Sequence, residues 1–212
     1  MRGRILAEIA EILPGVLHWS ARHPRIGQVV HSYYVEDAAA VLDPIVPAGV
    51  VAALKSRRPP ERILLTNRHH YRQSERLVSE FECPVLCPEP GLHEFEDGPE
   101  VEGYRYGDRV APGITAHEVG ALCPDDAALH VEVGPGALAF ADGLIRWDGE
   151  LAFVPDFLMD DPEQTKQGIV DSLRRLCELH FDVLLLAHGE PIVGEGRRAL
   201  REFVDAPRSA SF

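Results

Sequence analysis

Short runs of apolar residues, separated by Gly, Pro and Asp, recur along the chain and predict strands. Three segments between these runs, residues 46–58, 74–82 and 160–180, have the caps or the one-sided apolar pattern of helices. Strands that alternate with helices are typical of an α/β protein, and no repeat or linker divides the sequence. We therefore expect a single α/β domain over residues 1–212. The predicted strands are residues 28–36, 38–44, 62–67, 83–88, 113–119, 127–133, 136–145 and 181–191.

Residues with metal-binding side chains follow three strongly apolar strands. His69, Asp142 and His188 come after the runs Ile-Leu-Leu-Thr, Leu-Ala-Phe-Ala and Leu-Leu-Leu-Ala. In open sheets, binding sites form where strands end, because the strands fix positions and the loops supply the chemistry. These three residues are therefore predicted to converge on one site.

The charge and composition of the chain exclude several classes of partner. Its 212 residues carry a formal net charge of −13, which would repel the phosphate backbone of a nucleic acid. No stretch approaches the roughly 18 apolar residues of a membrane-spanning helix. Glu8 and Glu11 interrupt the N-terminal apolar segment in which a signal peptide would lie. We expect a soluble, cytoplasmic protein that binds neither nucleic acid nor membranes.

Other catalytic and metal-binding patterns are weak. Cys123 lies near His117 in the sequence, but no pattern orients a thiol beside a histidine base. Cys83 and Cys87 have no second closely spaced pair to complete a structural zinc site. The motifs of a serine nucleophile or a phosphate-binding loop are absent from the sequence.

Five short segments follow one another in the order and spacing of a known fold. They are LPGVLHW, SYYVEDAAAVLDP, RILLTNRHHYRQS, GALAFADGLI and LLLAHGEPI. From about Ile12 to Ile192 the chain thus resembles a divergent member of the metallo-β-lactamase fold superfamily. The resemblance implies a four-layer αββα sandwich, in which two mixed sheets face each other with helices outside. It places a site where the strands of residues 62–66, 136–141 and 183–187 end.

The first metal motif of that family is largely replaced in this chain. The motif reads Thr-His-x-His-x-Asp-His, and its side chains hold two metal ions, commonly zinc. With Thr66 aligned on the motif's threonine, His69 occupies the second histidine position. Residues other than the family's ligands occupy the remaining three positions, namely Asn67, Tyr71 and Arg72.

The later metal motifs are retained in part. Asp142 matches the aspartate that bridges the two ions, and His188 matches the last histidine. Leu122 occupies the position of the intervening histidine, although His117 could replace it through a shifted register. The resemblance therefore implies a degenerate site in which His69, Asp142 and His188 hold at most one ion.

Arginine near the site suggests a function without two metals. Arg72 is always protonated and cannot bind a cation. Our hypothesis is that Arg72, together with Arg68, pairs with Asp142 and replaces the charge of the second ion. The site would then be a metal-free module that binds a small molecule, and Arg68 and Arg72 would favour an anionic ligand. Ligand contacts are assigned to His70, Tyr71, Arg72 and His117.

A mononuclear hydrolase is the alternative. Two histidines and one carboxylate can hold one zinc, iron or manganese ion and leave positions open for water and substrate. The resemblance then implies hydrolysis of an ester, thioester or phosphoester, with Asp142 as the catalytic residue that orients water. His69, Asp142 and His188 could equally be hydrogen-bonded groups at strand ends and turns. Whether the chain is an enzyme stays open, and the sequence also allows a homodimer.

Overall fold

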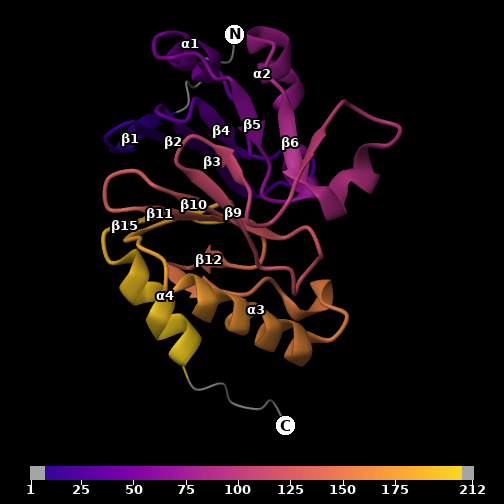
Figure 1. Cartoon of the computed structure of the whole chain (residues 1–212), viewed down its shortest axis with the longest axis vertical. Coiled ribbons are helices and arrows are strands. Elements are labelled where there is room, and N and C mark those ends of the chain that lie inside the picture. Colours follow the sequence, from indigo (N-terminus) through magenta and orange to yellow (C-terminus); the bar gives the residue numbers. More distant parts are fainter. Residues whose placement is uncertain (1–7, 207–212) are drawn as a thin grey trace.

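Two large sheets face each other, and helices cover the outer face of each sheet (Figure 1). The structure is a computed structural model and describes residues 8–206. The ends of the predicted domain, and the first residues of the segment in which no signal peptide was predicted, lie outside these residues. The arrangement confirms the predicted αββα architecture.

The first sheet contains seven strands in the order in which they occur along the chain. Strands β1 to β4 pair antiparallel, whereas β4 to β7 run parallel to one another. The strands are β1 Ile9–Leu13, β2 Val16–Arg22, β3 Val29–Val35, β4 Ala40–Leu42, β5 Arg62–Leu64, β6 Val85–Pro88 and β7 Glu102–Tyr104.

The second sheet contains six strands in the order β15-β14-β11-β10-β9-β8. Only the pair of β11 and β14 is parallel. A separate two-stranded sheet is formed by β12 and β13. These strands are β8 Arg109–Ala111, β9 Ile114–Glu118, β10 Ala127–Val131, β11 Ala137–Phe140, β12 Ile145–Trp147, β13 Glu150–Ala152, β14 Val183–Leu186 and β15 Ile192–Val193.

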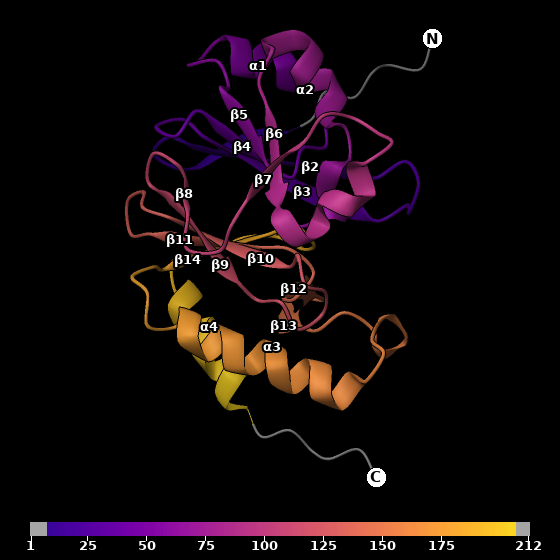
Figure 2. The ribbon, with the colours of Figure 1, turned by 45° about the vertical axis from the view of Figure 1, so that its right-hand side comes forward.

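Helices α1 and α2 lie on the first sheet, and α3 and α4 lie on the second (Figure 2). The α3 helix begins after Asp161, whose carboxylate accepts a hydrogen bond from the backbone N–H of Gln164 and thus satisfies one of the free N–H groups of the first turn. The helices are α1 Val50–Lys55, α2 Ser74–Phe81, α3 Pro162–Leu176 and α4 Gly196–Asp205, with short 3₁₀ segments η1 Arg68–Tyr71, η2 Glu89–Phe95 and η3 Asp156–Leu158.

The apolar core between the sheets holds their strand ends in a fixed relation. The Tyr33 ring is buried there, and its hydroxyl donates to the carbonyl of Leu186 at 2.8 Å and accepts from the N–H of Leu186 at 3.0 Å. Because Tyr33 lies on β3 and Leu186 ends β14, this pair of hydrogen bonds links the two sheets directly beside the predicted site. No helix among residues 8–206 is long and apolar enough to cross a membrane.

The apolar pattern located the eight predicted strands and three predicted helices correctly, although several of these elements are shorter than expected. It did not predict the remaining elements, which, apart from β2, are short, at sheet edges or rich in charge. The elements without a sequence prediction are β1, β2, β7, β8, β12, β13, β15, α4 and the three 3₁₀ segments.

Candidate metal and ligand site

Three side chains meet where β5, β11 and β14 end, as predicted, but one of them is not the predicted histidine. His70, Asp142 and His188 each present a ligand atom, and these atoms all lie within 4.8 Å of one another. His69 lines the neighbouring cavity but is exposed and is not part of this group. Successive residues of a 3₁₀ segment point about 120° apart, so the two histidines of η1 point in different directions.

A carboxylate beneath His70 fixes the orientation of its ring. His70 Nδ1 lies 3.1 Å from Asp43 Oδ2 and 3.0 Å from Thr66 Oγ1. The hydroxyl of Thr66 also donates to Asp43 Oδ2 at 2.5 Å. When Nδ1 carries the hydrogen towards Asp43, the lone pair of Nε2 is left for another partner. Histidines that bind metals are oriented by carboxylates in the same way.

The inner nitrogen of His70 is buried without a hydrogen-bond partner. Its Nε2 lies 3.5 Å from Asp142 Oδ1 but forms no hydrogen bond. Burial and the charge of Arg72 disfavour a protonated ring, but the carboxylates of Asp43 and Asp142 outweigh them and raise the pKa of His70 to about 9. In the metal-free chain, therefore, His70 is an imidazolium between two carboxylates.

Asp142 is held ionised at the centre of the group. Its Oδ1 lies 3.1 Å from His188 Nε2, and its Oδ2 accepts a hydrogen bond of 2.8 Å from Asn67 Nδ2. Burial opposes ionisation, but the contacts with His70 and His188 hold the pKa of Asp142 well below its usual range. Burial lowers the pKa of His188, so this ring is neutral at pH 7. Asn67, which replaces a ligand in the family pattern, thus positions the central carboxylate.

Arg72 does not pair with Asp142, contrary to our hypothesis. Its Nη1 donates to the carbonyls of His31 at 2.8 Å and Asp43 at 2.7 Å, and its Nη2 donates to that of Ala187 at 3.4 Å. The guanidinium therefore joins the ends of three strands, and its charge acts on Asp142 only over a distance. The planar fork of donors suits several carbonyl acceptors, which accounts for the choice of arginine here.

Arg68 likewise pairs with a different carboxylate. Its guanidinium forms an ion pair with Asp125, and its backbone N–H donates to Asp125 Oδ2 at 2.8 Å. The neighbouring Asp126 is fully buried, and neither of its carboxyl oxygens forms a hydrogen bond. Burial, together with the nearby Asp142, raises the pKa of Asp126 well above its usual value. Sequence reasoning missed Asp43, Asp125 and Asp126, because the family's ligand pattern gave no role to these positions.

Two residues predicted to contact a ligand lie elsewhere. The Tyr71 ring packs against Phe95, with ring centroids 5.8 Å apart, and does not line the cavity at the site. His117 lies on the opposite face of the second sheet, in a small cavity against α3 that Ser172 and Arg175 also line. Cys123 lines the cavity at the site, so it is separated from His117 and the thiol–histidine pair does not form. His70 and Arg72 do line that cavity.

A large cavity with an apolar rim opens onto the three clustered side chains. Its volume is about 1240 Å³. Of the six exposed large hydrophobic residues in the described part, all except Val193 line it. Arg22 and Arg146 also line it, and their guanidinium groups donate to backbone carbonyls rather than to carboxylates. The apolar rim consists of Ile26, Val29, Trp147, Phe157 and Leu158.

We expect Gly189→Ala to destabilise the loop that carries His188. Gly189 has φ +105°, and an added Cβ would lie 2.4 Å from the carbonyl oxygen of Arg146. Gly194 also has a positive φ, +72°, but has no atom within 4 Å of an added Cβ. Because only the first substitution adds a clash to the backbone strain, it should lower the free energy of unfolding by about 1–3 kcal/mol more than Gly194→Ala. Urea denaturation of both variants measures this difference, and equal losses would contradict the tight packing.

Comparisons with known proteins agree on the fold. Neither a protein-family model nor a curated protein sequence matches the chain. A metallo-β-lactamase from Pontibacter korlensis is similar with a TM-score of 0.69 and 14% identity, over 93% of this chain and 97% of the other. A metallo-β-lactamase from Hirschia baltica has a TM-score of 0.66 and 12% identity, over 96% of this chain and 100% of the other.

A different kind of protein shares the same architecture. A mutant of the flavo di-iron protein from Thermotoga maritima has a TM-score of 0.63 and 16% identity, over 93% of this chain and 60% of the other. At such identities the similarity concerns the course of the backbone rather than the activity. The chain therefore has the metallo-β-lactamase fold.

Proposed function

We propose that this protein is a mononuclear metal-dependent hydrolase whose single divalent ion is held by His70, Asp142 and His188. The observation that carries the proposal is the buried Nε2 of His70, which lacks a hydrogen-bond partner and faces the other two side chains. An unpaired buried polar atom costs stability, and a metal ion would satisfy it. Asp43 behind the ring supplies the orienting carboxylate that such ligands have.

The donor set fits one ion better than two. Two imidazoles and one carboxylate suit zinc, iron or manganese. A site for two ions needs about seven ligands on the family pattern, and this group offers three. When bound, one such ion polarises a substrate carbonyl and lowers the pKa of water to about 7. The charge of Arg72 nearby further disfavours a second cation.

The cavity supports a substrate with an apolar portion and a negative charge. Its exposed apolar rim would bury an acyl or aromatic group. Arg22 and Arg146 would attract an anionic group, since in the described residues their guanidinium groups contact backbone carbonyls and no carboxylate. The Arg68 charge, by contrast, is offset by Asp125. We propose a carboxylic ester or thioester, which water cleaves to a carboxylic acid and an alcohol or thiol.

A chain-length series tests this function. The zinc-loaded protein should hydrolyse aryl esters and thioesters of straight-chain acids, and kcat/KM should rise about three- to fourfold for each CH₂ that the rim buries. Phe157→Ser should flatten this dependence, because Phe157 is 84% exposed at the rim. Val193→Ser, at an exposed apolar residue outside the cavity, is the matched control. The proposal fails if no member of the series is hydrolysed by protein that has bound the metal.

A metal-free binding module remains the second candidate, and one observation favours it. The Asp142 carboxylate already accepts a hydrogen bond from Asn67 and lies 3.1 Å from His188 Nε2, and its charge is balanced by a protonated His70. The same cavity could then hold an amphipathic anion without any reaction. Zinc titration of the parent chain and of Asp142→Asn separates the two candidates, because a module of this kind would bind a straight-chain carboxylate but no zinc ion that depends on Asp142.

A further inference from the structure

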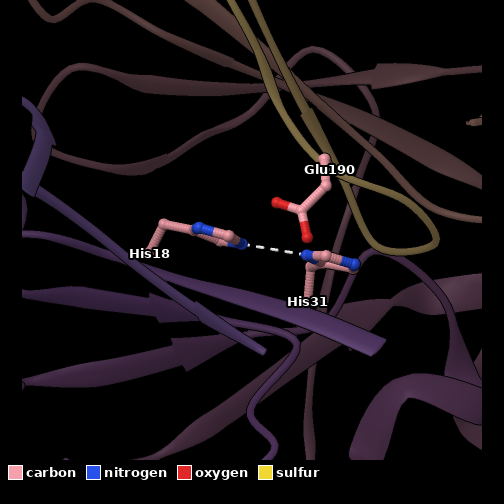
Figure 3. Close-up of side chains that lie close together, drawn as sticks. All are labelled: His18, His31 and Glu190. Atoms are coloured by element: carbon pink, nitrogen blue, oxygen red, sulfur yellow. Dashed lines mark hydrogen bonds between the residues drawn. The ribbon is translucent and has the colours of Figure 1, made fainter. Parts of the chain in front are cut away.

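A second group of potential ligands lies outside the cluster described above. His18, His31 and Glu190 come from β2, β3 and the loop between β14 and β15, and Figure 3 shows the Glu190 carboxylate directed towards the two rings. One ligand atom from each residue lies within 4.8 Å of the other two. The family pattern assigns none of these three residues.

Both sheets contribute to this group and hold it in place. His18 pairs with Tyr33 across β2 and β3, and His31 lies two residues before Tyr33, so all three side chains point to the same face of the sheet. The His18 ring stacks on that of Tyr33, with centroids 5.1 Å apart. The backbone N–H of His31 donates to the carbonyl of Ala187 at 3.0 Å, which ties β3 to the chain just before Glu190.

The two imidazoles share a single hydrogen bond and are otherwise enclosed. His18 Nε2 lies 2.9 Å from His31 Nδ1, and the ring planes differ by 4°. Burial lowers the pKa of His18 to about 4 and that of His31 to about 3. Both rings are therefore neutral at pH 7, the form in which imidazole binds a metal.

We propose that His18, His31 and Glu190 form a second site for one divalent transition metal ion, of which zinc is the best fit. Two imidazole nitrogens and one carboxylate are a ligand set that zinc accepts, with a fourth position left for water. Nitrogens on one tetrahedral zinc lie about 3.3 Å apart, so the two nitrogens need to separate by about 0.4 Å from the 2.9 Å of their hydrogen bond, and the rings need to turn so that both lone pairs point at the ion.

A metal ion could reach this second site from the cavity that opens onto His70, Asp142 and His188. His31 and Glu190 line the cavity, whereas His18 lies behind them. Glu190 is exposed, so an ion could reach the two buried rings from the cavity and keep its water on that side. The site does not depend on the proposed hydrolytic function, because it shares no ligand with His70, Asp142 and His188.

Zinc titration in a background without the first site tests the proposal. The Asp142→Asn/His188→Asn double variant should bind one zinc ion per chain in isothermal titration calorimetry. Adding Glu190→Gln should weaken this binding at least about tenfold. Glu150→Gln, which removes an exposed carboxylate outside the cavity, should leave the affinity unchanged. Adding His18→Asn should abolish binding, and thermal unfolding monitors whether each variant is folded.

Two results would overturn the proposal. One is a folded double variant that binds no zinc, and the other is an unchanged affinity after Glu190→Gln. Because Glu190 is exposed, that variant keeps the test decisive even if His18→Asn does not fold. Failure of the first site has a different signature, since the parent chain would then bind one ion that Glu190→Gln weakens and Asp142→Asn does not.

Discussion

Asp142→Asn should weaken zinc binding at the His70, Asp142 and His188 site at least about a hundredfold, because it removes one of three ligands and the negative charge between two histidines. The asparagine keeps the size of the side chain, so the fold should persist. Calorimetric titration in a Glu190→Gln background weakens the second site, so the remaining tight binding reports on this one. Hydrolysis, if it depends on the ion, should fall in parallel.

Asp148→Asn is the matched control for that experiment. Asp148 lines the same cavity and is exposed, but it is not part of the ligand group. Its φ of +49° is one that asparagine also adopts. The variant should bind zinc like the parent chain. An Asp142→Asn affinity equal to that of Asp148→Asn would show that the central carboxylate does not bind the ion.

Asp43→Ala should lower the free energy of unfolding by about 3–5 kcal/mol, as expected when one partner of a buried charged pair is removed. The Asp43 carboxylate accepts hydrogen bonds from the N–H and the hydroxyl of Thr66, and it faces His70 Nδ1. All three groups are buried, so water cannot replace the lost acceptor. Urea denaturation at pH 7 measures the loss.

Asp43→Asn distinguishes the loss of the side-chain charge from the backbone strain that alanine would add. Asp43 has φ +47°, a conformation that asparagine tolerates better than alanine. The asparagine should therefore fold better than the alanine variant but bind zinc about 10- to 100-fold more weakly than the parent, because the His70 ring loses its orienting carboxylate. A loss below about 1 kcal/mol in the alanine variant would contradict the structural role of this residue.

The sequence located the inner strands because their apolar runs are long enough to read, whereas the four-layer arrangement was predicted from the resemblance to the family. The strands β11 and β14 end two residues before Asp142 and His188, whereas His70 follows β5 only after the start of η1. The α4 helix was missed because its sequence is rich in charge, although Leu200 and Val204 are buried at helical spacing. Short edge strands such as β15 have too few residues to show a pattern.

The sequence alone could not show which of His69 and His70 joins the cluster with Asp142 and His188. An extended strand end would have directed His69 inward, but Asn67 begins a 3₁₀ segment in which His70 is the buried histidine. The hydrogen-bond partners of Arg72 could not be predicted either, because they are backbone carbonyls and no side-chain pattern indicates them. The signal that could have identified His70 is Asp43, a carboxylate that directly follows a buried strand.

Anomalous diffraction at the zinc edge, from crystals soaked in zinc, tests the central claim most directly. The account predicts one peak among His70 Nε2, Asp142 and His188, at about 2.0–2.2 Å from each ligand atom. Two peaks bridged by Asp142, or no peak in this group at full soaking, would contradict it.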